Sequence, residues 1–346
     1  MMRAPFRIGL LGLGNVGGAL ATRLTTDADR ITEAAGRPIS LEAVAVAHSG
    51  VRQLPAPQAS SEAIVGRRDL DAVVELIGGR EPAHTYISAA LAGGRQVVTA
   101  NKQVIAAFGP GLARLGPLRF EASVASAIPI VETLAETLAA DRVHSIVGIL
   151  NGTTNAMLQA MTAGASYDDA LADAQRRGLA EADPSADVDG HDPAAKLAII
   201  AMLAFRRRID PATIERVGIR NIGRKELLGA VERDCVIKLV ASATFAGGVV
   251  EADVRPRLLS IESPMARVNG AMNAIALEAT YAGSLLLAGP GAGPEAAASA
   301  VLADLVRAAK DMPAVAGGLL ASLSKSAPAP VRPPQSQVRH AAATAR

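Results

Sequence analysis

The chain has 346 residues, half of them hydrophobic, and a formal net charge of +2. This length is enough for a large core and for two domains. The small net charge and the 2% of aromatic residues argue against a nucleic-acid-binding surface and against attraction to an acidic membrane. The single cysteine, Cys235, excludes an intrachain disulfide and favours a reducing compartment.

Short apolar runs alternate with helical patterns over the first 140 residues. Strands are expected at 6–11, 41–47, 72–78, 96–100 and 119–125. Helices are expected from the glycine-rich turn to residue 24, from 81–82, after residue 101 and over 128–139. This alternation is typical of a parallel sheet with helices on both faces, so residues 1–140 are predicted to form an α/β, Rossmann-type doubly wound domain.

The pattern changes after residue 140 to that of an α+β domain, predicted over 141–288. A strand (142–150), a helix (153–161), an acidic stretch and an apolar helix (194–205) come first, and 217–222, 236–245 and 249–254 have mixed strand and helix patterns. A glycine loop then leads into an alanine-rich helix over 289–309, and the Pro-, Ala- and Arg-rich residues 326–346 are expected to form a disordered tail. The N-terminal apolar run could suggest a signal peptide, but glycines interrupt it and it lacks a good cleavage site. No uninterrupted apolar segment reaches 18 residues, and the nearest carries Glu278 near its centre, so a cytoplasmic protein without a membrane span is expected.

A G-x-G-x-x-G motif lies between the first expected strand and its helix. The first glycine permits a tight turn, the second lets the backbone approach a pyrophosphate, and the third lets helix and strand pack closely. The helix N-terminus adds partial positive charge. The motif therefore predicts a dinucleotide site, the alternative being a glycine-rich turn without a ligand. The predicted cofactor contacts are Gly12, Gly14, Asn15, Val16 and Gly17.

The second strand lacks the acidic residue that usually binds the ribose 2′-hydroxyl of NAD. His48, Ser49 and Arg52 stand there instead, which favours NADP over NAD unless they are ordinary surface residues. Lys102 follows the fourth strand, at the sheet edge where ligands of doubly wound folds bind. A lysine at a strand end can also be simply solvated.

The stretch from 181 to 199 places many ionisable groups beside an apolar helix. Asp192-Pro193 predicts a helix start with Asp192 as N-cap, and Lys196 four residues later lies on the same helix face. A lysine held near a carboxylate where a helix enters the core can stay charged and donate a proton. Glu181 lies on a loop that can fold back over this helix start and offers a carboxylate for a cationic substrate group.

Two simpler interpretations of this stretch remain. A calcium loop fits poorly, because placing Gly190 at its sixth position puts Ser185 at the first and Lys196 at the twelfth, where a bidentate glutamate belongs. A solvated loop is the other interpretation, and it applies best to Asp173, Asp183 and Asp187.

Seven blocks in order along the chain resemble homoserine dehydrogenase. Together they are highly specific, and they run from residue 9 to about residue 310. They are GLLGLGNVG (9–17), ELIGG (75–79), TANK (99–102), EASVASAIPI (121–130), GILNGTTN (148–155), EADPSADVDGHDPAAKLAI (181–199) and GPGAGPEAAASAV (289–301).

The resemblance implies NAD(P)-dependent interconversion of L-aspartate 4-semialdehyde and L-homoserine, in the biosynthesis of threonine, methionine and isoleucine. Carried over by position, Lys196 would be the proton donor and acceptor, Asp192 would orient it and contact the substrate, and Glu181 would bind the substrate amino group. Lys102 would face cofactor and substrate, and Gly291 would complete the cofactor pocket, so that segment 289–325 completes the first domain. The second domain would bind substrate and form a homodimer.

The resemblance also implies a monovalent cation site, usually for Na+, built largely from backbone oxygens. The matching residues are Glu121, Val124, Ser126 and Ile128. Many family members carry a C-terminal regulatory domain that binds threonine. Here about 35 residues follow the last matching block, too few for another folded domain. A short form without threonine feedback through such a domain is therefore expected.

Two other classes of protein share part of this pattern. Another amino-acid oxidoreductase, such as an aspartate dehydrogenase or a dihydrodipicolinate-type reductase, shares the glycine motif but not the set of Glu181, Asp192 and Lys196. A catalytically silent cofactor-binding protein, such as a redox sensor, would be expected to lack Lys196 or Asp192.

Overall fold

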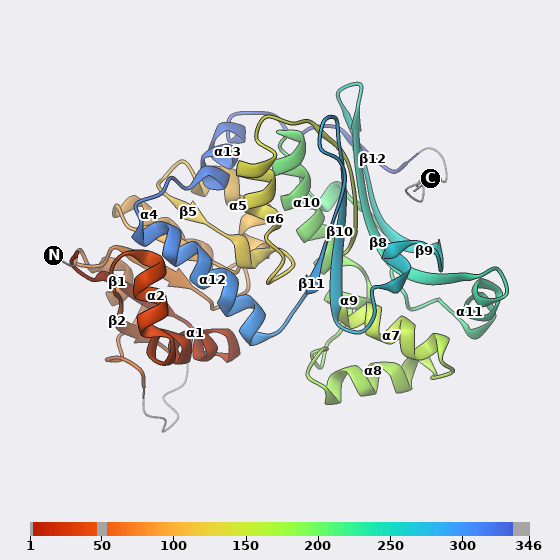
Figure 1. Cartoon of the computed structure of the whole chain (residues 1–346), viewed down its shortest axis with the longest axis horizontal. Helices are drawn as coiled ribbons and strands as arrows, with labels where there is room; N and C mark the ends of the chain where they lie inside the picture. The colour runs from red at the N-terminus through yellow and green to blue at the C-terminus, as the bar shows by residue number, and fades with distance from the viewer. Residues whose placement is uncertain (1–2, 47–53, 335–346) are drawn as a thin grey trace. The chain divides into compact units, whose positions relative to one another are not determined.

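The computed structural model describes residues 3–46 and 54–334, and it divides into two compact units. The first unit contains Met1–Thr137 and Gly293–Ser326, and the second contains Leu138–Ala292 and Ala327–Arg346. Figure 1 shows the elements of both. The C-terminal helices α12 and α13 therefore belong to the unit that begins at the N-terminus.

The first unit is built on a parallel sheet in the order β2-β1-β3-β4-β5. Its strands are β1 (Phe6–Leu11), β2 (Ile39–Ala45), β3 (Ala72–Glu75), β4 (Gln96–Thr99) and β5 (Leu118–Arg119). The chain enters at the centre of the sheet, adds β2 on one side and then returns to add β3 on the other. The strand order therefore reverses beside β1, and in doubly wound sheets ligands bind beyond the carboxyl ends of the strands at such a point.

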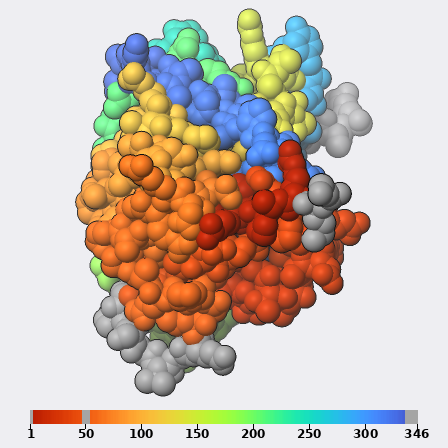
Figure 2. All heavy atoms as spheres, turned by 90° about the vertical axis from the view of Figure 1, so that its left-hand side faces the viewer, coloured from red at the N-terminus to blue at the C-terminus, as the bar shows by residue number. Residues whose placement is uncertain are grey.

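Helices cover both faces of this sheet, which confirms the predicted doubly wound class. They are α1 (Asn15–Thr26), α2 (Ala28–Ala35), α3 (Ser61–Gly66), α4 (Ala83–Ala92), α5 (Lys102–Leu112), α6 (Ile130–Glu132), α12 (Pro294–Ala309) and α13 (Val315–Leu323). Helices α1, α2 and α12 pack on one face over a core that includes Ile8, Leu10 and Val74. Helix α12 lies along α1 and α13 lies against α5, and Figure 2 shows this blue C-terminal segment against the red and orange N-terminal residues.

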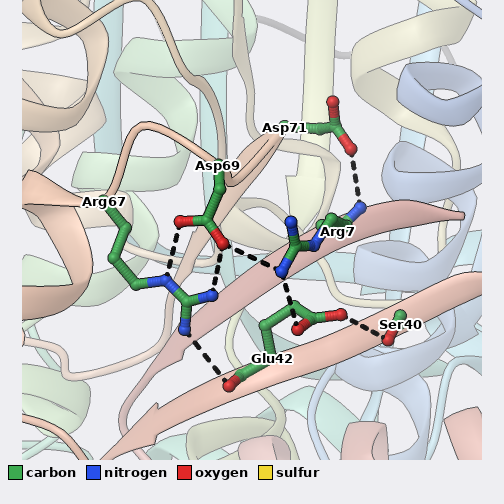
Figure 3. Close-up of polar contacts among 6 residues, drawn as sticks. All are labelled: Arg7, Ser40, Glu42, Arg67, Asp69 and Asp71. Carbon is green, nitrogen blue, oxygen red and sulfur yellow. Dashed lines mark hydrogen bonds and ion pairs between the residues drawn. The ribbon is translucent and has the colours of Figure 1, made fainter.

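An ion-pair network joins the amino ends of the strands, at the edge opposite to the glycine-rich turn (Figure 3). Arg7 Nη2, on β1, lies 3.1 Å from Glu42 Oε2 on β2 and 2.9 Å from Asp69 Oδ2. Arg67 also forms an ion pair with Asp69. The hydrogen bond from Arg67 is the main reason why the pKa of Asp69 falls to about 2. These side chains are partly exposed, so the network contributes little to stability. It mainly holds the segment before β3 beside β1 and β2.

The fifth strand is shorter than predicted. It ends at Arg119, and a 3-10 turn over Glu121–Ser123 follows in place of a strand to residue 125. The buried Glu121 carboxylate accepts hydrogen bonds from the N–H groups of Val131 and Glu132, which are 2.9 Å away. The chain turns here to satisfy the N-terminus of α6, which then continues as a π-helical turn over Thr133–Thr137 rather than as one regular helix.

The second unit contains a mixed sheet in the order β11-β10-β6-β8-β9-β12, with β7 also paired to β9. Its strands are β6 (Val143–Ile149), β7 (Glu215–Arg216), β8 (Cys235–Ala246), β9 (Val249–Ser260), β10 (Met272–Ala279), β11 (Gly283–Pro290) and β12 (Val331–Arg332). The pairs from β11 to β9 are antiparallel, whereas β7 and β12 are parallel to β9.

Helices pack against this sheet and complete the predicted α+β unit. They are α7 (Gly152–Thr162), α8 (Tyr167–Arg176), α9 (Ser185–Val188), α10 (His191–Phe205) and α11 (Arg224–Val231). Helix α10 contacts β6 and β8, and its residues from Leu197 to Leu203 are buried. Each leucine, isoleucine or methionine side chain among them stabilises the fold by roughly 1.5–3 kcal/mol when fully buried. Within residues 3–46 and 54–334, no helix is long and apolar enough to cross a membrane.

Two sequence predictions for this unit are corrected by the structure. Residues 217–222 do not form a strand, and the short β7 ends just before them at Arg216. The apolar run 272–289, for which no element was predicted, forms most of the hairpin of β10 and β11. The predicted disordered tail is wrong at its start, since Val331 and Arg332 pair with β9 and Arg332 forms an ion pair with Glu251. The edge of β9 supplies backbone partners for this segment. Residues 335–346 lie outside the described part.

A buried carboxylate ties α12 to the 3-10 turn of the first unit. Asp304 accepts a hydrogen bond from the Glu121 N–H at 2.9 Å, and burial raises the pKa of Asp304 to about 6. The folded state therefore binds this proton more tightly than the unfolded chain, whose aspartate pKa is about 3.9. The contribution to stability is complete below about pH 4 and is lost as the pH rises through about 6.

We predict that Asp304→Asn weakens the fall in unfolding free energy between pH 4 and pH 7, because asparagine can still accept the hydrogen bond but does not titrate. The change is at most about 3 kcal/mol across this range. Urea unfolding at several pH values measures it. Asp311→Asn, at an exposed position of the same segment, should keep the wild-type slope. An unchanged slope in Asp304→Asn would contradict the assignment.

Candidate active site

A buried ion pair occupies the first two turns of α10. Lys196 Nζ lies 2.8 Å from Asp192 Oδ2, and the side chains are only 10% and 6% exposed. Lys196 also donates a hydrogen bond to the Leu150 carbonyl at 2.8 Å, at the end of β6. The lysine head group is therefore held between a helix and a strand end, in a position that its flexible side chain would not keep by itself.

Asn151 links this pair to a second acid. Its Nδ2 atom donates to Asp192 Oδ2 at 2.9 Å and to Asp187 Oδ1 at 2.6 Å. Its Oδ1 atom accepts from the Thr154 N–H and so caps α7. One amide thus holds α7, α9 and α10 together around Lys196. The interpretation of Asp187 as a purely solvated residue is wrong, and Asn151 was not predicted, although asparagine directly after a strand and three residues before a threonine is a helix-cap signal.

The start of α10 differs from the prediction. The helix begins at His191 after Gly190, which has φ 82° and supplies no side-chain cap, so Asp192 is inside the first turn rather than the N-cap. The glycine ends α9 in the left-handed conformation and lets the next helix start at once. The carboxylate of Asp192 is consequently directed to Lys196 and Asn151 instead of to the helix N–H groups.

Burial of this ion pair has a cost that its Coulomb attraction only partly offsets. Such a pair is weak evidence for stability, and a lysine and a carboxylate placed together in partial burial are typical of acid–base sites. The arrangement can hold a proton at Lys196 Nζ and stabilise the resulting charge through Asp192.

Apart from Asp187, the acidic residues named for this region, Glu181, Asp183 and Asp173, make their contacts elsewhere. Glu181 is exposed, and Gln175 donates to its backbone carbonyl at 3.0 Å. Asp183 accepts from the Ser185 N–H, and Asp173 pairs with arginines of α8 and the turn after it. The structure therefore brings Asp192 and Lys196 together and leaves Glu181 available on the surface.

The glycine-rich turn of the first unit has the backbone that a pyrophosphate site needs. Gly12 has φ +97°, and a Cβ there would lie 2.7 Å from the Leu76 carbonyl oxygen. Gly14 is the N-cap residue of α1 and offers no side-chain cap, and a Cβ there would meet nothing within 4 Å. A Cβ on Gly17 would lie 2.2 Å from the Gly12 carbonyl oxygen. The open helix N-terminus at Asn15 and Val16 therefore fits a phosphate group.

Lys102 is the first residue of α5, at the carboxyl end of β4. Asn101 caps this helix by accepting from the Val104 N–H at 3.1 Å, and its Nδ2 atom donates to the Gly79 carbonyl at 2.7 Å. The structure thus places Lys102 at the same sheet edge as the glycine-rich turn, within the first unit.

Gly291 lies beside β10 in the second unit and contacts a buried amide. A Cβ at this position would come within 2.0 Å of Asn273 Cγ. Neither polar atom of the Asn273 side chain has a hydrogen-bond partner within the described residues. Close packing against Asn273 is therefore one reason why residue 291 is a glycine. The contact of Gly291 with the cofactor stays a prediction.

The four residues predicted to bind a monovalent cation lie in the turn between β5 and α6. Ser126 has φ 49°, so the backbone turns sharply there. The Ile128 carbonyl accepts from the Ile130 N–H at 2.8 Å, and the Glu121 carbonyl accepts from the Val124 N–H at 3.3 Å. A carbonyl oxygen has a second lone pair, so these groups fit a backbone-ligated ion. Over residues 3–46 and 54–334, no cluster of three or more His, Cys, Asp or Glu side chains suited to a metal is present.

His48, Ser49 and Arg52, on which the preference for NADP depends, lie outside the described residues.

We predict that Gly17→Ala raises the Kd for the reduced cofactor by more than about tenfold, because the new methyl group must displace the Gly12 carbonyl. Gly18→Ala is the matched control, since a Cβ there meets nothing within 4 Å and φ is not positive. Titration monitored by nicotinamide fluorescence measures both. Equal affinities in the two variants would contradict the role of Gly17.

Comparison with known proteins identifies the family. A family model described as homoserine dehydrogenase matches residues 129–306, and one described as homoserine dehydrogenase, NAD binding domain, matches residues 12–115. The homoserine dehydrogenase of Corynebacterium glutamicum is 42% identical over 319 residues, covering 88% of this chain and 72% of that protein. That of Mycobacterium tuberculosis is 41% identical over 343 residues, covering 95% and 77%.

Solved structures agree. A homoserine dehydrogenase from Thiobacillus denitrificans superposes with a TM-score of 0.87 at 37% identity, covering 95% of this chain and 80% of that one. A hyperthermophilic archaeal homoserine dehydrogenase in complex with NADPH gives a TM-score of 0.74 at 26% identity, covering 90% and 100%. The two family models match residues in both units of the fold, and the chain belongs to the homoserine dehydrogenase family.

Proposed function

We propose that this chain catalyses the NAD(P)-dependent interconversion of L-aspartate 4-semialdehyde and L-homoserine, a step toward threonine, methionine and isoleucine. The observation that carries the proposal is the buried pair of Lys196 and Asp192, 2.8 Å apart, in a chain of this family. A redox sensor would need no such pair. The membership of both units in the family argues against another amino-acid dehydrogenase.

The proton step is assigned to Lys196. When the aldehyde is reduced, the carbonyl oxygen becomes an alkoxide, and the Lys196 ammonium supplies its proton directly or through a water. In the reverse direction the neutral amine accepts the hydroxyl proton. Asp192 and the Leu150 carbonyl orient the amine, and Asn151 holds the Asp192 carboxylate in place. Bound nicotinamide supplies or accepts the hydride.

Two carboxylates are assigned to the substrate. Asp192 contacts it beside Lys196, and the exposed Glu181 binds its amino group. The assignment of Glu181 is supported by its exposed side chain and by Gln175, which holds the Glu181 backbone by a hydrogen bond. Glu181→Gln would accordingly weaken binding of the amino acid more than it lowers kcat.

The cofactor site is assigned to the glycine-rich turn, with Gly12, Gly14, Asn15, Val16 and Gly17 around the pyrophosphate. The clash that a Cβ would cause at Gly12 and at Gly17 supports this assignment. Lys102 and Gly291 are assigned as further cofactor contacts. NADP is proposed as the preferred form, because His48, Ser49 and Arg52 stand where an NAD-specific site has an acid.

Two further features are proposed with the activity. The turn that contains Glu121, Val124, Ser126 and Ile128 binds Na+ through backbone oxygens, and the sharp backbone at Ser126 supports this. The chain also forms a homodimer through its second unit, whose strands carry exposed apolar side chains, among them Leu258, Met272 and Leu286.

We predict that Lys196→Ala lowers kcat by roughly 10²- to 10⁴-fold, the usual contribution of a general acid–base group. The Kd for the reduced cofactor should stay within about twofold of wild type, because Lys196 belongs to the proton step. The readouts are homoserine oxidation by absorbance and cofactor binding by fluorescence. Lys225→Ala, on exposed α11, should leave both unchanged.

Removal of Lys196 alone leaves Asp192 as an uncompensated buried charge, which can unfold the protein. The double variant Lys196→Met with Asp192→Asn removes both charges and keeps the volume of the pair. It should be folded and equally inactive. Wild-type turnover in either folded variant would contradict the assignment of Lys196.

A further inference from the structure

The buried carboxylate of Glu75 lies at the end of β3 and takes no part in the proposed proton step. Glu75 is fully buried, with 0% exposure, and none of its hydrogen bonds goes to a lysine or arginine in the described residues. Its Oε1 atom accepts from the N–H groups of Ile77 and Gly78, at 2.8 and 3.2 Å. A buried carboxylate is costly unless it is hydrogen-bonded, so Glu75 depends on these N–H donors and on the donor to its second oxygen.

The second oxygen of Glu75 connects to the neighbouring strand. Glu75 and Thr99 are register partners in the parallel pair of β3 and β4. The Thr99 hydroxyl donates to Glu75 Oε2 at 2.5 Å and accepts from the Asn101 N–H at 3.0 Å. The Thr99 hydroxyl thus links the Glu75 carboxylate on β3 to the backbone that follows β4.

Asn101 closes the ring of hydrogen bonds. Its side chain donates to the Gly79 carbonyl at 2.7 Å. This carbonyl lies in the same turn as the Gly78 N–H, which donates to Glu75. Gly78 and Gly79 have φ +80° and +71°, a conformation that glycine adopts without strain. The ring therefore runs from Glu75 through Thr99 and Asn101 to the 78–79 turn and back to Glu75.

The ring holds two parts of the proposed cofactor site at the same sheet edge. Lys102 directly follows Asn101, and the Asn101 cap sets the first turn of α5. On the other side, the α-carbon of Gly12 packs on the peptide between Leu76 and Ile77, where a Cβ would lie 2.7 Å from the Leu76 oxygen. Displacement of the 76–79 backbone would therefore move both the glycine-rich turn and Lys102.

We propose that Glu75, Thr99 and Asn101 are positioning residues that fix Lys102 relative to the glycine-rich turn, so that pyrophosphate and nicotinamide are held at one spacing. They act through the backbone and do not touch the reacting atoms. The effect on turnover rests on the proposed function, whereas the effect on cofactor affinity does not. A small misplacement of a positioned group can lower the rate by roughly 10- to 100-fold.

The test uses Thr99→Val, which keeps the side-chain shape and leaves both Glu75 Oε2 and the Asn101 N–H without their partner. We expect the Kd for the reduced cofactor to rise, and kcat/KM for homoserine to fall, by roughly tenfold or more. Thr99→Ser retains the hydroxyl and should restore both to within about threefold of wild type. Ser40→Ala removes a hydroxyl that donates to a carboxylate, Glu42, at the opposite sheet edge and should change neither (Figure 3).

A second variant covers the case in which Thr99→Val does not fold. Asn101→Ser keeps a residue that caps α5 and removes the donor to the Gly79 carbonyl. It should again raise the cofactor Kd. If the folded variants lower only the thermal midpoint and keep wild-type Kd and kcat, the ring is merely structural and the proposal is wrong.

The two proposals fail in distinguishable ways. If wild-type protein binds NADPH or NADH but does not oxidise homoserine, the proposed function fails, and the cofactor Kd of Thr99→Val still decides the role of the ring. If wild-type protein turns over homoserine and Thr99→Val matches it, only the ring proposal fails. If wild-type protein binds neither cofactor, both are overturned.

Discussion

The charge of Lys196 is the constraint around which the second unit is organised. An ammonium group at the start of a buried helix needs a counter-charge and hydrogen-bond acceptors, and Asp192 and the Leu150 carbonyl provide them. Asp192 in turn needs a donor, which is Asn151, and the same amide caps α7 and reaches Asp187. Three helices and the end of β6 therefore meet at one amine, which is the group that we propose for the proton step.

The first unit is organised by a different constraint, the close approach of backbone segments at the carboxyl edge of its parallel sheet. Gly12 lies against the peptide after Leu76, and Gly17 lies against the carbonyl of Gly12. The hydrogen bonds of Glu75 hold the same peptide from the other side. The proposed cofactor site therefore consists mostly of main chain, positioned by glycines and by the buried carboxylate of Glu75.

The sequence was sufficient for the doubly wound class and for the meeting of Lys196 with Asp192, because strand alternation and the i, i+4 spacing are local patterns. It was insufficient for features that depend on contacts between residues far apart in the sequence. The contact of Asn151 with Asp187 joins residues 36 apart, and that of Glu75 with Thr99 depends on strand register. The N-cap residue of α10 is Gly190 and not the predicted Asp192. A glycine in the left-handed conformation has no capping side chain that would mark the position in the sequence.

The most direct test is turnover by the purified wild-type protein with L-homoserine at alkaline pH, with NADP and NAD in parallel, monitored by absorbance of the reduced nicotinamide. We expect oxidation of homoserine, faster at equal concentration with NADP than with NAD. A folded protein that binds the cofactor but reduces neither form in the presence of homoserine would contradict the central claim, and the buried pair of Lys196 and Asp192 would then serve another reaction.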